Sequence, residues 1–529
     1  MWRWIVTLVT VVISVWCGGA WALGSDDISK LVVGESDNRI AALNKVVANG
    51  DQAALPFLQK LLDDSVKIAG GKVYLISDGK ATDPLTGLAL TLPEAAEDVV
   101  NNNRMRSELE TAIAALKLFS KERVVRLGAA KALEEAEADD SKLTLIKQAE
   151  QVEQDKEIRT LLVQVRAGIQ LNSKDKDTRL AAVSSLGEGD SQNAKLMLSS
   201  RLAAGGETDQ EVRASIKQTL RVIESRQAGY EYAGMVFTGL SLGSILLLAA
   251  LGLAVTYGLM GVINMAHGEM MMIGAYTTYV VQNLFRNSLP EYFQWYLLAA
   301  VPAAFAVTAL IGVVLERSVL RFLYGRPLES LLATWGISLI LMQLVRSLFG
   351  AQNVGVENPA WMSGGIEIAS NLVLPFNRIA IIGFSVTVLL LMWLLLARTR
   401  LGLFVRAVTQ NRSMASCIGV PTGKVDTRAF ALGSGIAGLA GVALSQIGNV
   451  GPDLGQHYIV DCFMVVVLGG VGQLAGAAYA ALGLGIVSKF LEGFAGAVLA
   501  KIIVLVFIII FIQKRPQGLF AIKGRSVET

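Results

Sequence analysis

The chain has 529 residues, of which 53% are apolar and 17% charged, and its formal net charge is +3. It is too apolar for a disordered chain, and three cysteines exclude a scaffold held together by disulfides. Residues 23–228 hold 28 Lys and Arg against 32 Asp and Glu, whereas residues 229–529 hold 18 against 12. The overall figures therefore average over an acidic, soluble-like part and a mildly basic, apolar part.

The first 22 residues have the pattern of a secretory signal peptide. Arg3 supplies a positive charge, Ile5 to Trp16 form an apolar stretch, and Ala20-Trp21-Ala22 resembles a cleavage site. An uncleaved first membrane helix is the alternative, but the stretch is shorter than the about 20 residues that span a bilayer. A signal peptide over 1–22 predicts that residues 23–228 are extracytoplasmic.

Residues 23–228 are patterned as amphipathic helices. Between Ile40 and Leu62 apolar residues recur at helical spacing, with a break expected at Pro56. The stretch 69–93 contains Gly and Asp and predicts a loop or a short hairpin. An Arg followed by Ala and Leu recurs at irregular steps of 33, 20 and 34 residues, at Arg126, Arg159, Arg179 and Arg213. The recurrence resembles helical-hairpin repeats of the HEAT type.

The soluble part offers no catalytic constellation. No His occurs before His267, which excludes a His-based triad or a His-ligated metal site in residues 1–266. Its charged faces are interpreted as solvated helix surfaces, with docking of a partner protein on a concave face as the alternative. The fold class predicted for the whole chain is all-α, with a soluble helical domain followed by a polytopic membrane domain of about nine spans.

Charge-free windows define those spans. The nine predicted segments are 234–257, 262–283, 295–316, 328–349, 378–397, 427–447, 459–472, 474–491 and 498–513. Lys and Arg gather at 317–326, 398–428 and 514–525, which the positive-inside rule makes cytoplasmic. An extracytoplasmic 23–228 and a cytoplasmic C-terminus require an odd number of crossings. Seven spans with two re-entrant segments is the alternative.

Polar residues in an apolar window are candidates for a solute path. Asn264, His267 and Glu269 follow a Gly-rich apolar helix, and polar groups at that depth are costly unless they are functional or buried between helices. The predicted path residues are Ser241, Ser244, Tyr257, Asn264, His267 and Glu269. A structural network that holds two helix ends together is the alternative. Hydroxyl and amide groups suit a small neutral solute that both donates and accepts hydrogen bonds.

The basic loop 398–428 has the features of a docking element. Residues 403–417 are expected to form a short helix that ends near Gly419 and Pro421. Its candidate contact residues recur at a spacing of four to five positions and are Gly402, Arg406, Ala407, Asn411, Ala415 and Gly419. A plain juxtamembrane helix on anionic lipid is the alternative.

Two further features of the sequence are its glycine motifs and its lack of a nucleotide-binding motif. Gly469-Gly470-Val471-Gly472 predicts a turn between two helices or a re-entrant break. The stripe from Gly433 to Gly441 predicts close helix packing, within the chain or with a second membrane subunit. The sequence contains no Gly-x-x-x-x-Gly-Lys-[Ser/Thr], so ATP would have to be hydrolysed by a separate subunit.

At Asn264-Met265-Ala266-His267-Gly268-Glu269, with Ile273-Gly274-Ala275-Tyr276, the chain resembles the permeases of branched-chain amino acid type ABC importers. The resemblance covers 233–520 and includes Arg515-Pro516-Gln517-Gly518-Leu519-Phe520. Within that family, a signal peptide, an external helical domain and the tail 522–528 resemble the urea-type permeases.

The resemblance implies a transport subunit of the inner membrane that is not an enzyme and holds no cofactor or metal. Its implied partners are ATP-binding cassette subunits, a second permease, a periplasmic binding protein and membrane lipids, with no nucleic acid. The expected function is ATP-driven import of urea or a short amide, with 398–428 coupling the permease to the ATPase.

Three other functions stay open. A branched-chain amino acid fits the same family, because the binding protein usually sets specificity there. An ion-coupled transporter or urea channel would use Glu269, Asp461, Lys489 and Glu492 as a relay. A receptor fits less well, because the sequence has many polar-lined spans and no cytoplasmic output domain.

Overall fold

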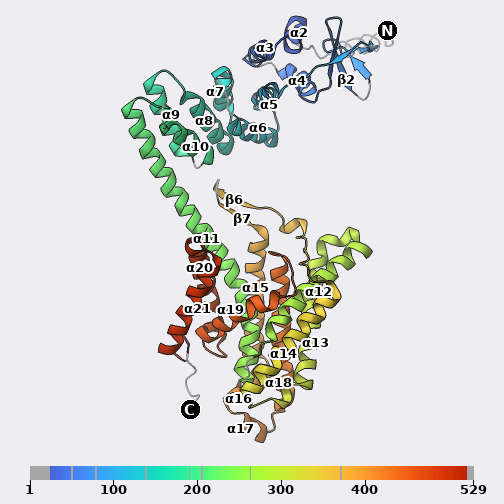
Figure 1. The fold of residues 1–529 in the computed structure, drawn as a ribbon, viewed down its shortest axis with the longest axis vertical. Helices are drawn as coiled ribbons and strands as arrows, with labels where there is room; N and C mark the ends of the chain where they lie inside the picture. The colour runs from blue at the N-terminus through green and yellow to red at the C-terminus, as the bar shows by residue number, and fades with distance from the viewer. Residues whose placement is uncertain are drawn as a thin grey trace, which may run out of the picture. The chain divides into compact units, whose positions relative to one another are not determined.

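Figure 1 shows the fold in a computed structural model of the chain. The structure describes residues 24–48, 52–77, 80–93, 95–136, 140–189, 191–203, 206–261, 264–369, 372–516 and 518–520. The predicted signal peptide over 1–22 and the tail 522–528 lie outside these residues. The chain divides into two compact units between Gln227 and Ala228, a position within one continuous helix, α11.

The first unit is mainly helical. Its elements are α2 (Ser25–Val32), α3 (Ser36–Ala48), η1 (Gln52–Ala54), α4 (Leu55–Leu62), α5 (Asn103–Lys117), α6 (Arg123–Glu135), η2 (Asp140–Lys142), α7 (Leu143–Val152), α8 (Lys156–Gln170), α9 (Lys176–Glu188), α10 (Gln192–Leu202) and the start of α11 (Gln210–Met260). Pro56 lies in the first turn of α4, where its missing N–H leaves no helix bond unmade. The predicted break between α3 and α4 is therefore confirmed.

The recurring Arg residues belong to a repeat of three helices, α6–α8 and α9–α11. Arg126 donates from Nε to Glu153 at 2.7 Å and from Nη1 to the Ser120 carbonyl at 3.0 Å. Arg179, 53 positions later, makes the equivalent bonds to Glu207 and Ser173, both at 3.0 Å. The steps look irregular in the sequence because each repeat contains two helix starts of this kind.

A small antiparallel sheet interrupts the helices. It consists of β1 (Val66–Ala69), β2 (Lys72–Ser77), β3 (Lys80–Thr82), β4 (Ala89–Leu90) and β5 (Glu97–Asp98), in the order β4-β3-β2-β1-β5. A hairpin is therefore present, as the sequence predicts, but it is one part of a five-stranded sheet that the sequence does not predict. Gly70 and Gly71 both have positive φ, as a two-residue hairpin turn requires, and Leu75 of β2 packs into the helical core. Apart from this sheet and one hairpin in the second unit, the regular elements of the described residues are helices, which confirms the all-α class.

The second unit is a helix bundle. Its helices after α11 are α12 (His267–Ser288), η3 (Pro290–Trp295), α13 (Tyr296–Ser318), η4 (Leu320–Phe322), α14 (Pro327–Phe349), η5 (Ala360–Met362), α15 (Phe376–Arg398), α16 (Arg400–Gln410), α17 (Arg412–Cys417), α18 (Thr422–Ser445), α19 (Leu454–Gly469), α20 (Leu474–Ala495) and α21 (Ala497–Lys514). A hairpin of β6 (Gly365–Ala369) and β7 (Leu372–Pro375) precedes α15.

Each of the nine predicted spans coincides with a helix, but not all of them are equally apolar. Among the described helices, seven are long and apolar enough to cross a membrane by length and composition. The two that fall short are α12, which carries the polar motif, and α19, which has only 16 residues. Seven was the alternative number. Gly470 and Gly472, both at positive φ, form the predicted turn between α19 and α20.

The helices divide into an inner and an outer set. In α18, 83% of the most apolar window is buried, against 22% in α13, α14 and α15. An outer helix buries one narrow stripe and exposes apolar side chains elsewhere, as a lipid-facing helix does. The buried stripe of α13 takes nearly every fourth residue and consists of Tyr296, Leu297, Ala300, Ala304, Thr308, Gly312 and Glu316.

Glycines bring the inner helices into backbone contact. A Cβ added at Gly274 of α12 would lie 2.2 Å from the Gly438 carbonyl oxygen of α18, and one added at Gly441 would lie 1.9 Å from the Met271 carbonyl oxygen. No side chain fits at these positions, so packing within the chain is confirmed there. Gly483 of α20, in contrast, has no atom within 4 Å of such a Cβ.

Candidate functional site

The connection between α11 and α12 places polar side chains inside the bundle. Asn264 is 2% exposed, and its Oδ1 accepts a hydrogen bond of 3.1 Å from the Ala266 N–H. His267 is fully buried, and its Nε2 lies 3.0 Å from the Ala249 carbonyl oxygen of α11. Because a carbonyl can only accept, Nε2 carries the hydrogen, and a neutral ring then presents Nδ1 as an acceptor. Neither this Nδ1 nor the Asn264 amide nitrogen has a partner among the described atoms.

Glu269 lies where α12, α14 and α19 meet. It is 1% exposed, and its Oε1 accepts a hydrogen bond of 2.8 Å from the Ser338 hydroxyl of α14. Its other oxygen has no partner in the described part of the chain. Gly268 touches Gly455 of α19, so the first turn of α12 lies against the first turn of α19. The hydrogen-bond partner of the Glu269 carboxylate among the described residues is thus a neutral hydroxyl.

The three predicted path residues on α11 differ in their surroundings. Ser241 is fully buried, and its hydroxyl has no partner within the described residues. Ser244 donates to the Leu240 carbonyl of its own helix at 2.8 Å, while its backbone carbonyl accepts from Ser385 of α15 at 3.0 Å. Tyr257 is half-buried and packs against Phe463 of α19, with ring centroids 6.0 Å apart. Ser241 is therefore the one of the three best placed to bond a solute.

Sequence reasoning missed the polar side chains that face this region from other helices. On α14 the buried hydroxyls of Ser330, Thr334 and Ser338 are spaced by four residues, and Thr334 accepts a hydrogen bond of 3.2 Å from the Met265 N–H. Tyr276 lies two turns after Glu269 on α12, and its buried hydroxyl lacks a described partner. The signal was present as a spacing of four in an otherwise apolar helix.

These residues give the bundle buried polar atoms whose hydrogen-bonding capacity is unused. They are the Ser241 hydroxyl, the Asn264 amide nitrogen, the His267 Nδ1, one Glu269 oxygen and the Tyr276 hydroxyl. Each such atom, left unpaired in an apolar interior, costs about 1–3 kcal/mol. A small neutral molecule that both donates and accepts hydrogen bonds has the chemistry to pair with such atoms.

The residues of the alternative ion relay have separate partners. Lys489 donates to Glu492 on the same helix at 2.5 Å, and Asp461 of α19 lies 3.4 Å from the Lys501 ammonium of α21. Glu269 has Ser338 as its hydrogen-bond partner instead. The four residues named for a relay therefore fall into three separate sets of contacts.

The basic loop differs from its prediction as one helix over 403–417. Two helices are present, α16 and α17, and Asn411 between them has an extended backbone with φ −155° and ψ 102°. Asn411 also caps α17, because its side-chain oxygen accepts from the Met414 N–H at 2.8 Å. This capping competes with continuation of the helix, so the single-helix prediction is wrong.

The six predicted docking residues do not share one exposed face. Gly402 and Ala415 are buried, and Ala407 is half-buried. Arg406, Asn411 and Gly419 are exposed, and Arg406 donates to the Leu396 carbonyl at 2.8 Å. The largest exposed apolar side chains of this loop are others, namely Leu403, Met414 and Ile418. The sequence did not single them out, because apolar residues are ordinary next to a membrane helix.

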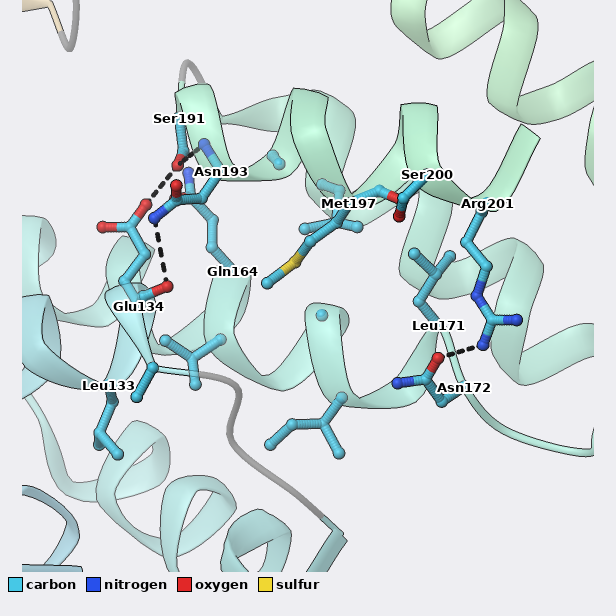
Figure 2. A pocket seen from close by; sticks show the side chains of 16 residues that line it. Leu133, Glu134, Gln164, Leu171, Asn172, Ser191, Asn193, Met197, Ser200 and Arg201 are labelled. Atoms are coloured by element: carbon cyan, nitrogen blue, oxygen red, sulfur yellow. Dashed lines mark hydrogen bonds between the residues drawn. The ribbon is translucent and has the colours of Figure 1, made fainter. Parts of the chain in front are cut away.

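The first unit contains a hollow of its own, which Figure 2 shows. It encloses about 400 Å³ and is lined mainly by α8 and α10. Glu134, Gln164, Ser191 and Asn193 lie at one end, and Asn172 and Arg201 lie at the other (Figure 2). The Gln164 side-chain oxygen is buried there without a described partner. No sequence pattern indicates this hollow, because its residues come from separate helices.

Comparison with known proteins identifies what the second unit is similar to. Residues 235–512 match the family described as branched-chain amino acid transport system / permease component. The high-affinity branched-chain amino acid transport system permease protein BraD of Pseudomonas aeruginosa is 28% identical over 294 residues, which are 55% of this chain and 96% of that protein. The corresponding LivH protein of Escherichia coli K12 is 28% identical over 291 residues, 54% of this chain and 94% of that protein.

A more distant similarity and one negative result complete the comparison. The ribose import permease protein RbsC of Escherichia coli K12 is 29% identical over 204 residues, 37% of this chain and 61% of that protein. No solved structure matches the chain. The family match begins at residue 235, so the first unit lies outside it.

Proposed function

Because the chain belongs to the family of permease components of branched-chain amino acid transport systems, we propose that it is the urea-carrying membrane subunit of an ATP-driven importer. A periplasmic binding protein delivers urea or a short amide, and ATP-binding subunits supply the energy. The relatives named above are transport permeases rather than enzymes. The membership and the seven apolar helices make the chain a polytopic protein of the inner membrane.

The observation that carries the choice of solute is the environment of Glu269. Its hydrogen-bond partner is the neutral Ser338 hydroxyl, and among the described residues it has no cation as a partner. A zwitterionic amino acid would bring a carboxylate that meets like charge there as well as an ammonium group, whereas urea brings no charge and offers four N–H donors and one acceptor. The unpartnered atoms of Ser241, Asn264 and His267 supply further acceptors and donors along the same inner helices. These features support a neutral amide as the solute.

The relatives' names favour a second candidate, a branched-chain amino acid. Uptake assays with both radiolabelled solutes separate the two. With its partner subunits, the permease is expected to support ATP-dependent urea uptake that excess leucine does not inhibit. Leucine uptake without urea uptake would replace the urea assignment with the amino acid one.

The loop 398–428 is the docking element for the ATP-binding subunits in this proposal. Leu403, Met414 and Ile418 are 58%, 61% and 71% exposed, and such apolar side chains on a polar loop suit a partner's cleft. Substituting Met414 and Ile418 by Ser should release the ATPase from the complex in co-purification. The same double substitution should leave the permease in the membrane, because neither side chain is buried in it.

The first unit is an extracytoplasmic docking domain in this proposal, brought across the membrane by the signal peptide over 1–22. Its hollow between Glu134 and Arg201 combines amide side chains, which read a peptide backbone, with opposite charges at its two ends. The binding protein or the second permease would occupy it. Substituting Gln164 and Asn193 by Leu should weaken that association while the permease still inserts.

A further inference from the structure

Two buried carboxylates lie at the junction of the loop 398–428 with the bundle, outside the path described above. Glu316 in the last turn of α13 is 1% exposed, and Asp426 near the start of α18 is fully buried. Burial of a carboxylate is unfavourable unless charged or hydrogen-bonding partners compensate for the lost water. Both carboxylates have such partners, and the partners come from different elements.

Asp426 is paired with Arg412, the first residue of α17. The Arg412 Nη1 donates to Oδ1 at 3.2 Å, and Nη2 donates to the other carboxylate oxygen. The guanidinium also lies 5.0 Å from the ring centroid of Tyr324, in the segment between η4 and α14. A two-pronged pair of this kind fixes the orientation as well as the distance of the elements that carry it. Arg412 thus holds α17 against α18.

Glu316 accepts hydrogen bonds on both oxygens. The Tyr324 hydroxyl donates to Oε1 at 2.9 Å, and the Thr427 hydroxyl of α18 donates to Oε2 at 2.7 Å. Burial raises the pKa of Tyr324 above its ordinary value, so the phenol remains a donor at neutral pH. We name the five side chains Glu316, Tyr324, Arg412, Asp426 and Thr427 the α17 latch. It joins α13, the segment before α14, α17 and α18.

The other attachments of α17 are the buried side chain of Ala415 and backbone contacts at its two ends. At its start, Asn411 has an extended backbone and separates α17 from α16. At its end, the Val420 N–H donates to the Ala415 carbonyl at 3.0 Å as the chain turns toward α18. The helix is six residues long and exposes Met414. It is therefore a short helix that the extended residue Asn411 separates from α16 and that Arg412 links to α18.

Helix α18 contacts α12, the helix that carries two of the predicted path residues. Gly441 and Gly438 touch the backbone of α12 at Met271 and Gly274, with no side chain between the two helices. Because these contacts join backbone to backbone, a change of side-chain rotamer cannot accommodate a displacement of α18. A displacement of α18 therefore has to move α12 as well. The same α12 carries His267 and Glu269 in its first turn.

We propose that the α17 latch transmits the motion of loop 398–428 to α18 and α12, with Arg412 as the positioning residue. The proposal rests on the proposed function, because it assumes an ATPase that moves this loop. Arg412 contacts neither solute nor nucleotide in this role. Its loss should separate ATP hydrolysis from transport rather than abolish either step.

The test measures ATP hydrolysis and solute uptake by the complete importer in proteoliposomes, for the wild type and four variants. Arg412→Gln breaks the pair, Arg412→Lys keeps the charge, and Arg412→Gln/Asp426→Asn removes both charges so that no carboxylate is left buried and unpaired. Arg317→Gln is the control, since it removes an exposed charge next to Glu316 from the same end of α13. Co-purification of the ATPase establishes that each variant assembles.

The expected result is that the double variant assembles and hydrolyses ATP, while its uptake per ATP falls about tenfold. Arg412→Lys should recover part of that loss, and Arg317→Gln should match the wild type. A double variant with the wild-type ratio of uptake to hydrolysis would overturn the proposed role of the α17 latch but not the proposed function. A wild-type importer that shows no ATP-dependent uptake would overturn the proposed function, and the latch with it.

Discussion

The Ser338 hydroxyl of α14 donates a hydrogen bond of 2.8 Å to Glu269 of α12, deep in the bundle. One oxygen of this carboxylate is thereby held, and the other has no partner in the described part of the chain. A carboxylate fixed on one side and open on the other is suited to accept a hydrogen bond from a passing solute.

Substituting Glu269 tests this role. Glu269→Ala removes both acceptors and should lower urea uptake at least about tenfold, the equivalent of about 1.4 kcal/mol. Glu269→Gln keeps an oxygen for Ser338 and should lower uptake only about threefold, since a neutral hydrogen bond is about half as strong as a charged one. Initial rates at several urea concentrations give both values. Equal, wild-type rates in both variants would remove Glu269 from the path.

The contact between α12 and α18 makes a prediction about stability. Gly441→Ala would place a methyl group 1.9 Å from the Met271 carbonyl oxygen, so the helices must separate, at about 1–3 kcal/mol. The variant should melt at a lower temperature in detergent and transport poorly. Gly483→Ala is the matched control, because its methyl group meets open space. A Gly441→Ala protein as stable as the Gly483→Ala protein would contradict the backbone contact.

The repeated ion pairs of the first unit predict which arginine side chains contribute to its thermal stability. Glu153 and Glu207 each keep only 5% of their side chain exposed, under Arg126 and Arg179 respectively. Arg126→Ala and Arg179→Ala should each lower the melting temperature of the full-length protein, because a covered carboxylate loses its cation.

The matched control for these pairs is Arg104→Ala. Arg104 pairs with Asp37 at 2.7 Å, but the two side chains are 68% and 77% exposed. Water already solvates such a pair, so its loss should change the melting temperature little. A fall in melting temperature as large as that of Arg126→Ala would mean that side-chain exposure does not determine how much each pair contributes to stability.

The cap of α8 predicts a pH dependence. The hydrogen bond from Arg123 and those from backbone N–H groups hold the pKa of Asp155 below its ordinary value of 3.8. A carboxylate whose pKa is lower in the folded state adds stability above its unfolded pKa and loses it as pH falls through the folded pKa. The first unit should therefore keep this stabilisation at pH 5 and lose it only below about pH 4. Thermal unfolding followed by circular dichroism should show a steeper acid loss in the wild type than in Asp155→Asn.

The sequence located most of the helices but not their roles in the bundle. The nine apolar segments were visible because burial in lipid requires long charge-free windows. Their division into inner α18 and outer α13–α15 was not, since both kinds are apolar, and only the four-residue stripes distinguish them. The sheet between β1 and β5 was missed because its strands are two to six residues long.

The candidate site was predicted in part for a similar reason. Asn264, His267 and Glu269 stand out because they are adjacent polar residues in an apolar window. Their partners Ser338 and Thr334 are single hydroxyls on a distant helix, which only the fold brings near. The break between α16 and α17 at Asn411 could not be predicted either. An Asn is found both inside helices and at their N-caps, and only the fold shows that Asn411 caps α17.

The central claim is that this permease carries urea in an ATP-driven importer. The most direct measurement is uptake of radiolabelled urea into proteoliposomes that contain the permease with its ATPase, second permease and binding protein. The account predicts urea accumulation that requires ATP, is unaffected by a proton ionophore and falls at least about tenfold in Glu269→Ala. Urea entry that equilibrates without ATP, or that collapses with the ionophore, would contradict it.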